Sequence, residues 1–266
     1  MDPTALAKYW ETIERLGIIP LVAETDGRIV GHLDVIISDE LSLGHFIYLD
    51  ILMVHRAYRR RGVASALIKE AERLAISRKV RFMCVEPEQY EGPPGLTYRS
   101  CDFEKAFDTY HLETSVDHPE IPSGVQVVSI PQIQSVPIRT HIMMCGWYNI
   151  SVKMWNFGIN PDLESSRAFC YHDLALSALT SESIYFFYLQ QKRFDHSTGR
   201  LCLWAPTPLN QEELQDIIQV SKTVASWLGI KTLTTKTIER YLPTLEKAGF
   251  KINSKGEPFL IKNVSQ

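Results

Sequence analysis

The sequence predicts an α/β fold of the mixed α+β kind, built as two tandem copies of a mixed central sheet flanked by helices. Predicted strands and helices alternate along the first part of the chain, which is typical of layered α/β folds. A polar stretch at residues 114–124, with two prolines and a glycine, interrupts this order. A similar order restarts after it. We therefore expect two domains of ordinary size, at residues 1–118 and 119–266.

Composition narrows the function classes. With 45% apolar residues, the 266-residue chain can bury a sizeable core. Its 28 basic and 31 acidic residues give a net charge of −3, which excludes a strongly basic nucleic-acid binder and a polyacidic disordered chain. We expect no membrane span, because no run of 18 uncharged apolar residues occurs. Five cysteines without a Cys-x-x-Cys pair predict free thiols, no metal site and a cytoplasmic location.

The first half supplies clear local signals. Apolar residues at three- and four-residue steps predict a helix over residues 4–16. Two β-branched runs around an Asp-Gly pair predict a hairpin over 19–38. The nearly uninterrupted apolar run 46–54 predicts a strand covered on both faces. The remaining expected elements are a helix over 63–77, a strand over 80–85, a loop over 86–95, a short helix over 96–101 and a strand over 103–113.

The second half repeats a similar order with weaker signals. Residues 125–130 predict a strand, and 132–144 a helix that Pro137 weakens. The other expected elements are strands over 185–191, 200–204 and 231–235, helices over 211–228 and 239–248, and a final strand or hairpin over 251–261.

The segment after the buried strand 46–54 carries the chemistry. The strand ends, the chain turns through three consecutive arginines, and a helix begins at Gly62. The first amides of a helix have no intrahelical acceptor and lie at its positive end. Small residues at this turn let phosphates approach those amides, so the segment predicts an anion site that fits a pyrophosphate.

Two motifs here resemble a known family. The segment RRRGVA at residues 59–64 resembles the Arg/Gln-x-x-Gly-x-Gly/Ala signature of the GCN5-related N-acetyltransferase (GNAT) superfamily. The segment YRSCDF at 98–103 resembles its Tyr-x-x-x-Gly-Phe motif, with Asp102 in place of glycine. The resemblance covers about residues 5–113. It implies that residues 1–118 form a GNAT catalytic domain that binds acetyl-CoA and releases CoA.

The resemblance also implies cofactor contacts. The strand before the signature would separate from its neighbour and pair with the pantetheine arm, and the signature amides would hold the pyrophosphate. The cofactor-binding residues implied in this way are Leu52, Met53, Val54, Arg59, Arg60, Arg61, Gly62, Val63, Ala64 and Ser65.

Asp50 and Tyr98 are the candidate catalytic residues. An amine must lose a proton before it attacks a thioester, and the departing thiolate must gain one. Asp50, nine residues before Arg59, is the candidate base, at a place where several family members have a carboxylate. Strand alternation predicts that it shares a face with Leu52 and Val54. Tyr98 is the candidate acid. Structural roles stay open for both: an Asp paired with an arginine inside the sheet, and a core tyrosine.

The second half resembles the same family in degenerate form. Leu245 stands where the motif tyrosine would be, and the turn at residues 204–210 has no glycine or arginine. Residues 119–266 are therefore expected to form a GNAT-like domain without a pyrophosphate loop. Because the chain starts almost directly at a helix, the first domain is expected to borrow a strand, with residues 125–130 as the candidate.

The function expected from these residues is acetyl transfer from acetyl-CoA to the primary amine of a small molecule. Two alternatives remain open: a non-catalytic acyl-CoA-binding sensor or regulatory protein, and a peptide or protein N-acetyltransferase. We expect no nucleic-acid or membrane partner and leave a homodimer open.

Overall fold

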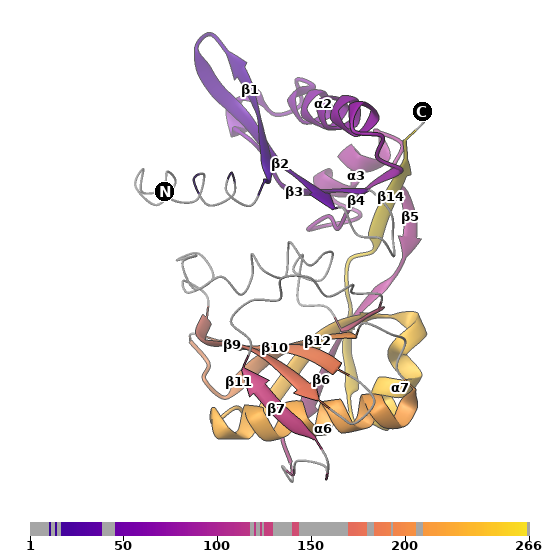
Figure 1. Ribbon diagram of the computed structural model, residues 1–266. Coiled ribbons are helices and arrows are strands. Elements are labelled where there is room, and N and C mark those ends of the chain that lie inside the picture. The colour runs from indigo at the N-terminus through magenta and orange to yellow at the C-terminus, as the bar shows by residue number, and fades with distance from the viewer. Residues whose placement is uncertain are drawn as a thin grey trace. The chain divides into compact units, whose positions relative to one another are not determined.

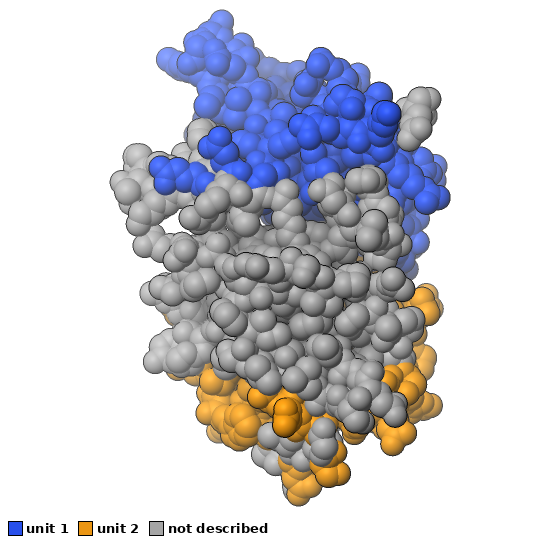
Figure 2. All heavy atoms as spheres, viewed as in Figure 1, with its two compact units in different colours: residues 1–108, 257–266 blue, residues 109–256 orange. Residues whose placement is uncertain are grey.

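The computed structural model describes residues 11, 14, 17–38, 46–117, 120, 123, 125–129, 140–143, 170–179, 184–192, 194–205 and 210–264. The chain forms two compact units (Figure 2): unit 1 contains residues 1–108 and 257–266, and unit 2 contains residues 109–256. None of the described helices is long and apolar enough to cross a membrane.

Unit 1 contains a mixed sheet in the order β1-β2-β3-β4-β14-β5, together with helices α2 and α3 (Figure 1). Its elements are β1 (Ile19–Thr25), β2 (Arg28–Ser38), β3 (Phe46–Val54), η1 (Arg56–Tyr58), α2 (Val63–Ser77), β4 (Phe82–Val85), α3 (Pro93–Arg99), β5 (Glu104–Phe107) and β14 (Phe259–Asn263). The hairpin of β1 and β2 is confirmed, and both turn residues, Asp26 and Gly27, have positive φ, as a tight hairpin turn requires.

The core of unit 1 lies between α2 and one face of this sheet. The apolar stripe of α2, with Leu67, Ile68 and Ala71 fully buried, packs on side chains of β2, β3 and β4. Gly31 in β2 is part of this contact, because a Cβ there would come within 2.8 Å of Val63 Cγ1. The first turn of α2 therefore rests directly on the sheet.

Unit 2 is a second mixed sheet, in the order β13-β6-β12-β11-β10-β9-β7, and β8 also pairs with β11. The strands are β6 (Thr109–Ser115), β7 (Gln126–Ser129), β8 (Thr140–Met143), β9 (Cys170–Leu179), β10 (Ile184–Lys192), β11 (Thr198–Ala205), β12 (Thr232–Ile238) and β13 (Lys251–Lys255). The other elements are α6 (Gln211–Trp227), η3 (Glu239–Tyr241) and α7 (Leu242–Lys247). Long helix α6 covers one face of the sheet (Figure 1) and buries Leu214, Ile217 and Val224.

The two units exchange one strand each. β14, from the end of the chain, lies between β4 and β5 in unit 1, where Leu260 pairs with Val85 on one side and Lys105 on the other. β6, which directly follows β5 in sequence, lies between β12 and β13 in unit 2. The units therefore do not divide at residue 118 as expected, because residues 109–117 belong to unit 2 and residues 257–266 to unit 1.

Several expectations change with this exchange. Unit 1 does borrow a strand, but the candidate was wrong: residues 126–129 form β7, which pairs with β9 in unit 2, and the borrowed strand is β14. The predicted strand 103–113 is two strands in different sheets, and so is the segment 251–261. Residues 140–143, expected in a helix, form strand β8, and the rest of 132–144 lies outside the described residues. So does most of the helix expected at 4–16, of which Glu11 and Glu14 are helical.

The cysteines also depart from the expectation. Cys84 and Cys101 are buried free thiols, whereas Cys202 is disulfide-bonded.

Replacing Leu260 by Ala tests the borrowed strand. Leu260 is fully buried in the core of unit 1, so we expect a loss of about 2–5 kcal/mol in the free energy of unfolding of that unit. Denaturant unfolding followed by circular dichroism measures it. Ile252→Ala, at an exposed position in β13, is the control with a small effect. A Leu260→Ala protein as stable as the control would show that unit 1 does not need β14.

Candidate functional site

The sheet of unit 1 opens between two parallel strands. β3 and β4 pair at Phe46–Phe82, Ile47–Met83 and Tyr48–Cys84, and the pairing stops there. β3 continues to Val54, while its opposite edge stays paired with β2. Beyond Tyr48, the edge of β3 that faced β4 is paired with no described strand. Such an edge can bind an extended ligand that carries amide groups.

A β-bulge in β3 directly follows Asp50. Ile51 has a φ of 49°, and the register with β2 shifts between His32 and Asp34. Positive φ is strained for a β-branched residue, and such strain concentrates at functional sites. The extra residue puts both Leu49 and Leu52 against the core under α2.

Asp50 consequently lies on the opposite face of the sheet, where it pairs across the ladder with Asp34. It does not share a face with Leu52 as expected, because the bulge interrupts the two-residue alternation.

The environment of Asp50 suits a general base. Burial raises the pKa of Asp50 from 3.8 to about 6, against a backbone hydrogen bond from Ile51 that lowers it. The negative charges of Asp34 and Glu88 raise this pKa further. Asp34 itself is only 2% exposed, and its Oδ1 lies 2.8 Å from His32 Nε2. A carboxylate with a pKa near working pH exchanges protons effectively.

Tyr98 lies near enough to Asp50 to feel its charge. The tyrosine comes from α3, is 4% exposed and contacts Phe103 edge-on, with ring centroids 5.5 Å apart. Burial raises the pKa of Tyr98 well above its usual value, and the charges of Asp50 and Glu88 contribute. The hydroxyl therefore keeps its proton at working pH. The structure brings the candidate base and the candidate acid into one electrostatic environment.

The N-terminus of α2 is open. Its N-cap, Gly62, has a φ of 81° and forms no side-chain cap, and its first turn holds no acidic residue. Ala66 N–H already donates to Gly62 O at 2.9 Å, so the amides before it, at Val63, Ala64 and Ser65, are the ones that an anion can accept from.

The three arginines before this helix end are exposed. Arg59 Nε donates to Val54 O at 3.1 Å, which ties the loop to the end of β3, and the Arg61 guanidinium lies 5.4 Å from the Tyr58 ring centroid. Arg60 has a positive φ of 62°, as the tight turn requires. The loop is therefore shaped by backbone geometry and adds positive charge beside the open amides.

The corresponding place in unit 2 is closed. The parallel strands β11 and β12 also pair only at their first residues, 198–200 with 232–234. Three residues further on, however, β8 pairs with Leu203, Trp204 and Ala205 of β11. β10 holds the other edge of β11 through Trp204, so β8 must lie on the edge that β12 has left.

The N-terminus of α6 is closed as well. Asn210 Oδ1 accepts from Glu213 N–H at 2.9 Å, and Glu213 Oε2 accepts from Asn210 N–H at 2.8 Å. Glu212 and Glu213 place negative charge in the first turn. The capping box thus occupies the amides of Asn210 and Glu213, and the two carboxylates of the first turn repel an anion.

Comparison with known proteins agrees with this geometry. Residues 2–91 match the acetyltransferase (GNAT) family. The match covers about a third of the chain, within unit 1. The two sheets fit two GNAT-like copies. A comparison with curated proteins gave no match.

Solved structures show the fold. The chain is similar to a GCN5-related N-acetyltransferase from Anabaena variabilis, at 13% identity and a TM-score of 0.63, over 96% of this chain and 66% of that one. It is also similar to a tandem GNAT protein from the clavulanic acid biosynthesis pathway, at 14% identity and a TM-score of 0.53, over 94% and 83%. Eis1 from Mycobacterium abscessus is similar at 13% identity and a TM-score of 0.57, over 98% and 70%. The chain thus spans just under two thirds of the Anabaena protein.

Sequence reasoning missed Asp34, Glu88 and the bulge at Ile51. Asp34 had a usable signal, because it is the one carboxylate inside the otherwise mostly apolar strand Arg28–Ser38.

Asp102 stands where the Tyr-x-x-x-Gly-Phe motif has glycine, and its backbone explains why both residues fit. Its φ is 65°, a value that glycine adopts freely and aspartate tolerates. Within the described residues, no group of three or more His, Cys, Asp or Glu side chains could hold a metal ion.

Asp50→Asn should make the protein more stable at neutral pH. Because the folded-state pKa of Asp50 is raised to about 6, the folded state binds the proton more tightly, and stability is lost as pH rises through that value. We expect Asp50→Asn to gain up to about 3 kcal/mol in the free energy of unfolding at pH 8 and to match the wild type near pH 4. Urea unfolding at both pH values measures the difference.

Asp26→Asn, in the exposed turn between β1 and β2, is the matched control and should change little at either pH. A loss of stability for Asp50→Asn at pH 8 would contradict the raised pKa.

Proposed function

We propose that unit 1 transfers an acetyl group from acetyl-CoA to the primary amine of a small molecule. The observation that carries the proposal is the open edge of β3 beside the open N-terminus of α2, with Asp50 and Tyr98 sharing one environment in the same unit. The family match and the fold support acyl transfer, and the acetyl group and the small amine are the finer parts of the proposal.

The residues present fit the cofactor. The edge of β3 at Leu52, Met53 and Val54 would pair with the amides of the pantetheine arm. Residues 59–65 would hold the pyrophosphate through the amides of Val63, Ala64 and Ser65, and Arg60 and Arg61 would add positive charge. Bound there, acetyl-CoA supplies a thioester whose carbonyl carbon an amine can attack.

Asp50 and Tyr98 would move the protons. Asp50 takes one proton from the substrate ammonium, directly or through one water, so that the nitrogen lone pair can form the new C–N bond. As the C–S bond breaks, Tyr98 would donate its hydroxyl proton to the departing thiolate sulfur, and the second proton that the nitrogen loses on forming the amide would restore the Tyr98 hydroxyl. The nearby carboxylates of Asp34 and Glu88 favour a cationic substrate over a neutral one.

Unit 2 would have no cofactor of its own. Strand β8 lies where a pantetheine arm would pair, and at the N-terminus of α6 the capping box occupies the amides of Asn210 and Glu213 while Glu212 and Glu213 add negative charge. We therefore propose one acetyl-CoA per chain. A cytoplasmic location and a homodimer remain predictions.

Ser65→Glu tests the cofactor site. Ser65 has the same place in α2 that Glu213 has in α6, three residues after the N-cap. A carboxylate there favours the helix and repels phosphate, so we expect acetyl-CoA affinity to fall at least about 100-fold (about 2.7 kcal/mol) with an unchanged melting temperature. Isothermal titration should give one acetyl-CoA per wild-type chain.

The matched control is Ser77→Glu, the same change at the far end of α2, which should bind acetyl-CoA as the wild type does. Two acetyl-CoA per chain, or full affinity in Ser65→Glu, would refute the assignment to unit 1.

Tyr98→Phe tests the acid. Losing the hydroxyl removes the proton donor but keeps the buried ring, so we expect kcat to fall on the order of 100-fold with an unchanged KM for acetyl-CoA. Thiol release during turnover of an amine panel measures both constants. Tyr110→Phe, at a half-buried tyrosine of unit 2, is the control. Binding of acetyl-CoA without turnover of any amine would favour the sensor, and turnover of peptides alone would favour the peptide acetyltransferase.

A further inference from the structure

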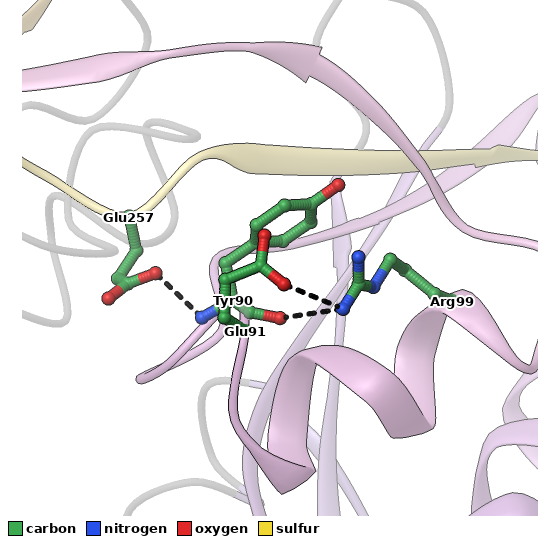
Figure 3. Close-up of polar contacts among 4 residues, drawn as sticks. All are labelled: Tyr90, Glu91, Arg99 and Glu257. Carbon is green, nitrogen blue, oxygen red and sulfur yellow. Dashed lines mark hydrogen bonds and ion pairs between the residues drawn. The ribbon is translucent and has the colours of Figure 1, made fainter.

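Glu257 connects the end of the chain to a loop beside the candidate site. It is the first residue of the returning segment of unit 1 and stands just before β14. Its Oε2 accepts a hydrogen bond from Tyr90 N–H at 2.6 Å (Figure 3). Tyr90 belongs to loop 86–92, between β4 and α3. A carboxylate acceptor makes this bond stronger than an ordinary backbone one.

Arg99 holds the same residue from the other side. Its guanidinium carbon lies 4.4 Å from the centroid of the Tyr90 ring, and its terminal nitrogen donates to Tyr90 O at 3.4 Å and to Glu91 Oε2 at 3.2 Å (Figure 3). Gly95 adds a steric limit, because a Cβ there would lie 1.9 Å from Tyr90 O. We call Glu257, Tyr90 and Arg99 the Tyr90 clamp.

The clamp controls groups that the proposed reaction needs. Arg99 directly follows Tyr98 in α3, and Glu88 stands two residues before Tyr90 in the loop. Glu88 is among the charges that act on both Asp50 and Tyr98. A shift of Tyr90 would therefore displace the carboxylate beside the base and loosen the helix that carries the acid.

The clamp is not what holds β14 in place. β14 is paired with β4 on one edge and β5 on the other. Lys262 Nζ also lies 2.8 Å from Glu72 Oε1 of α2. Removing the Glu257 carboxylate should therefore leave the strand where it is and release only the loop.

We propose that Glu257 is a positioning residue for acetyl transfer, acting through Tyr90 to hold loop 86–92 and Tyr98 beside Asp50. The inference rests on the proposed function of unit 1. It assigns the returning segment that carries Glu257 and β14 a role in the geometry of the site as well as in the sheet.

Three substitutions at Glu257 separate positioning from simple stability. Glu257→Ala removes the acceptor, and Glu257→Asp withdraws it by one methylene, so we expect both to lower kcat about tenfold or more with an unchanged KM for acetyl-CoA. Glu257→Gln keeps an oxygen acceptor at the same reach and should stay within about twofold of the wild type. The matched control is Glu70→Ala, which breaks the solvent-exposed ion pair with Arg73 in α2 and should also stay within about twofold.

Hydrogen–deuterium exchange gives a readout without substrate. In Glu257→Ala, peptides covering loop 86–92 should exchange at least about tenfold faster than in the wild type, while those covering β14 keep their protection. An unchanged kcat in Glu257→Ala, a loss in Glu257→Gln as large as in Glu257→Ala, or an unchanged loop exchange would overturn the role of Glu257. A wild-type protein that binds acetyl-CoA and transfers nothing would instead overturn the proposed function.

Discussion

The candidate site depends on the early separation of two parallel strands. β3 and β4 pair at three positions and then separate, so the C-terminal half of β3 has one backbone edge that a ligand can pair with. An unpaired backbone edge is costly when it is buried, and the sheet accepts it here together with a strained Ile51. Asp50 follows core-facing Leu49 and so lies on the opposite face, across the ladder from Asp34, while the bulge at Ile51 returns Leu52 to the core face. The ligand edge and the candidate base thus lie on the same strand.

The strand exchange makes unit 1 depend on the last residues of the chain. β14 fills the position between β4 and β5, and its Leu260 completes the core under α2. The contacts of β14 therefore join residues far apart in sequence, which slows folding because a long loop must close first. The same exchange brings Glu257 to loop 86–92 and so couples sheet completion to the geometry around Tyr98.

Local signals in the sequence were enough for much of the fold. The Asp-Gly pair predicted the hairpin of β1 and β2. The continuous apolar run predicted β3, and the helical spacing of apolar residues predicted α2, both with the bounds observed. The open helix end at Gly62 could also be predicted, since the sequence places small residues where the helix begins. The alternation of apolar and polar residues identifies a strand but not the strand it pairs with, so β6 and β14 could not be assigned to their sheets from the sequence. The bulge escaped prediction because β-branched Ile51 locally disfavours the left-handed region that the site imposes on it.

The two units differ in how they satisfy two sets of backbone groups: the strand edge left where two parallel strands separate, and the first amides of the next helix. Unit 2 pairs the edge left by β12 with its own β8 and caps α6 with Asn210 and Glu213, so the folded unit satisfies these groups itself. Unit 1 leaves both places open, and hydration or a ligand must satisfy them instead. A ligand that binds only the folded state raises the free energy of unfolding by RT ln(1 + [L]/Kd), where [L] is its free concentration. Acetyl-CoA would therefore stabilise unit 1 selectively. In unit 1 the ligand would pair the open strand edge and the open helix end, whereas unit 2 pairs the matching groups with its own β8 and its own helix cap.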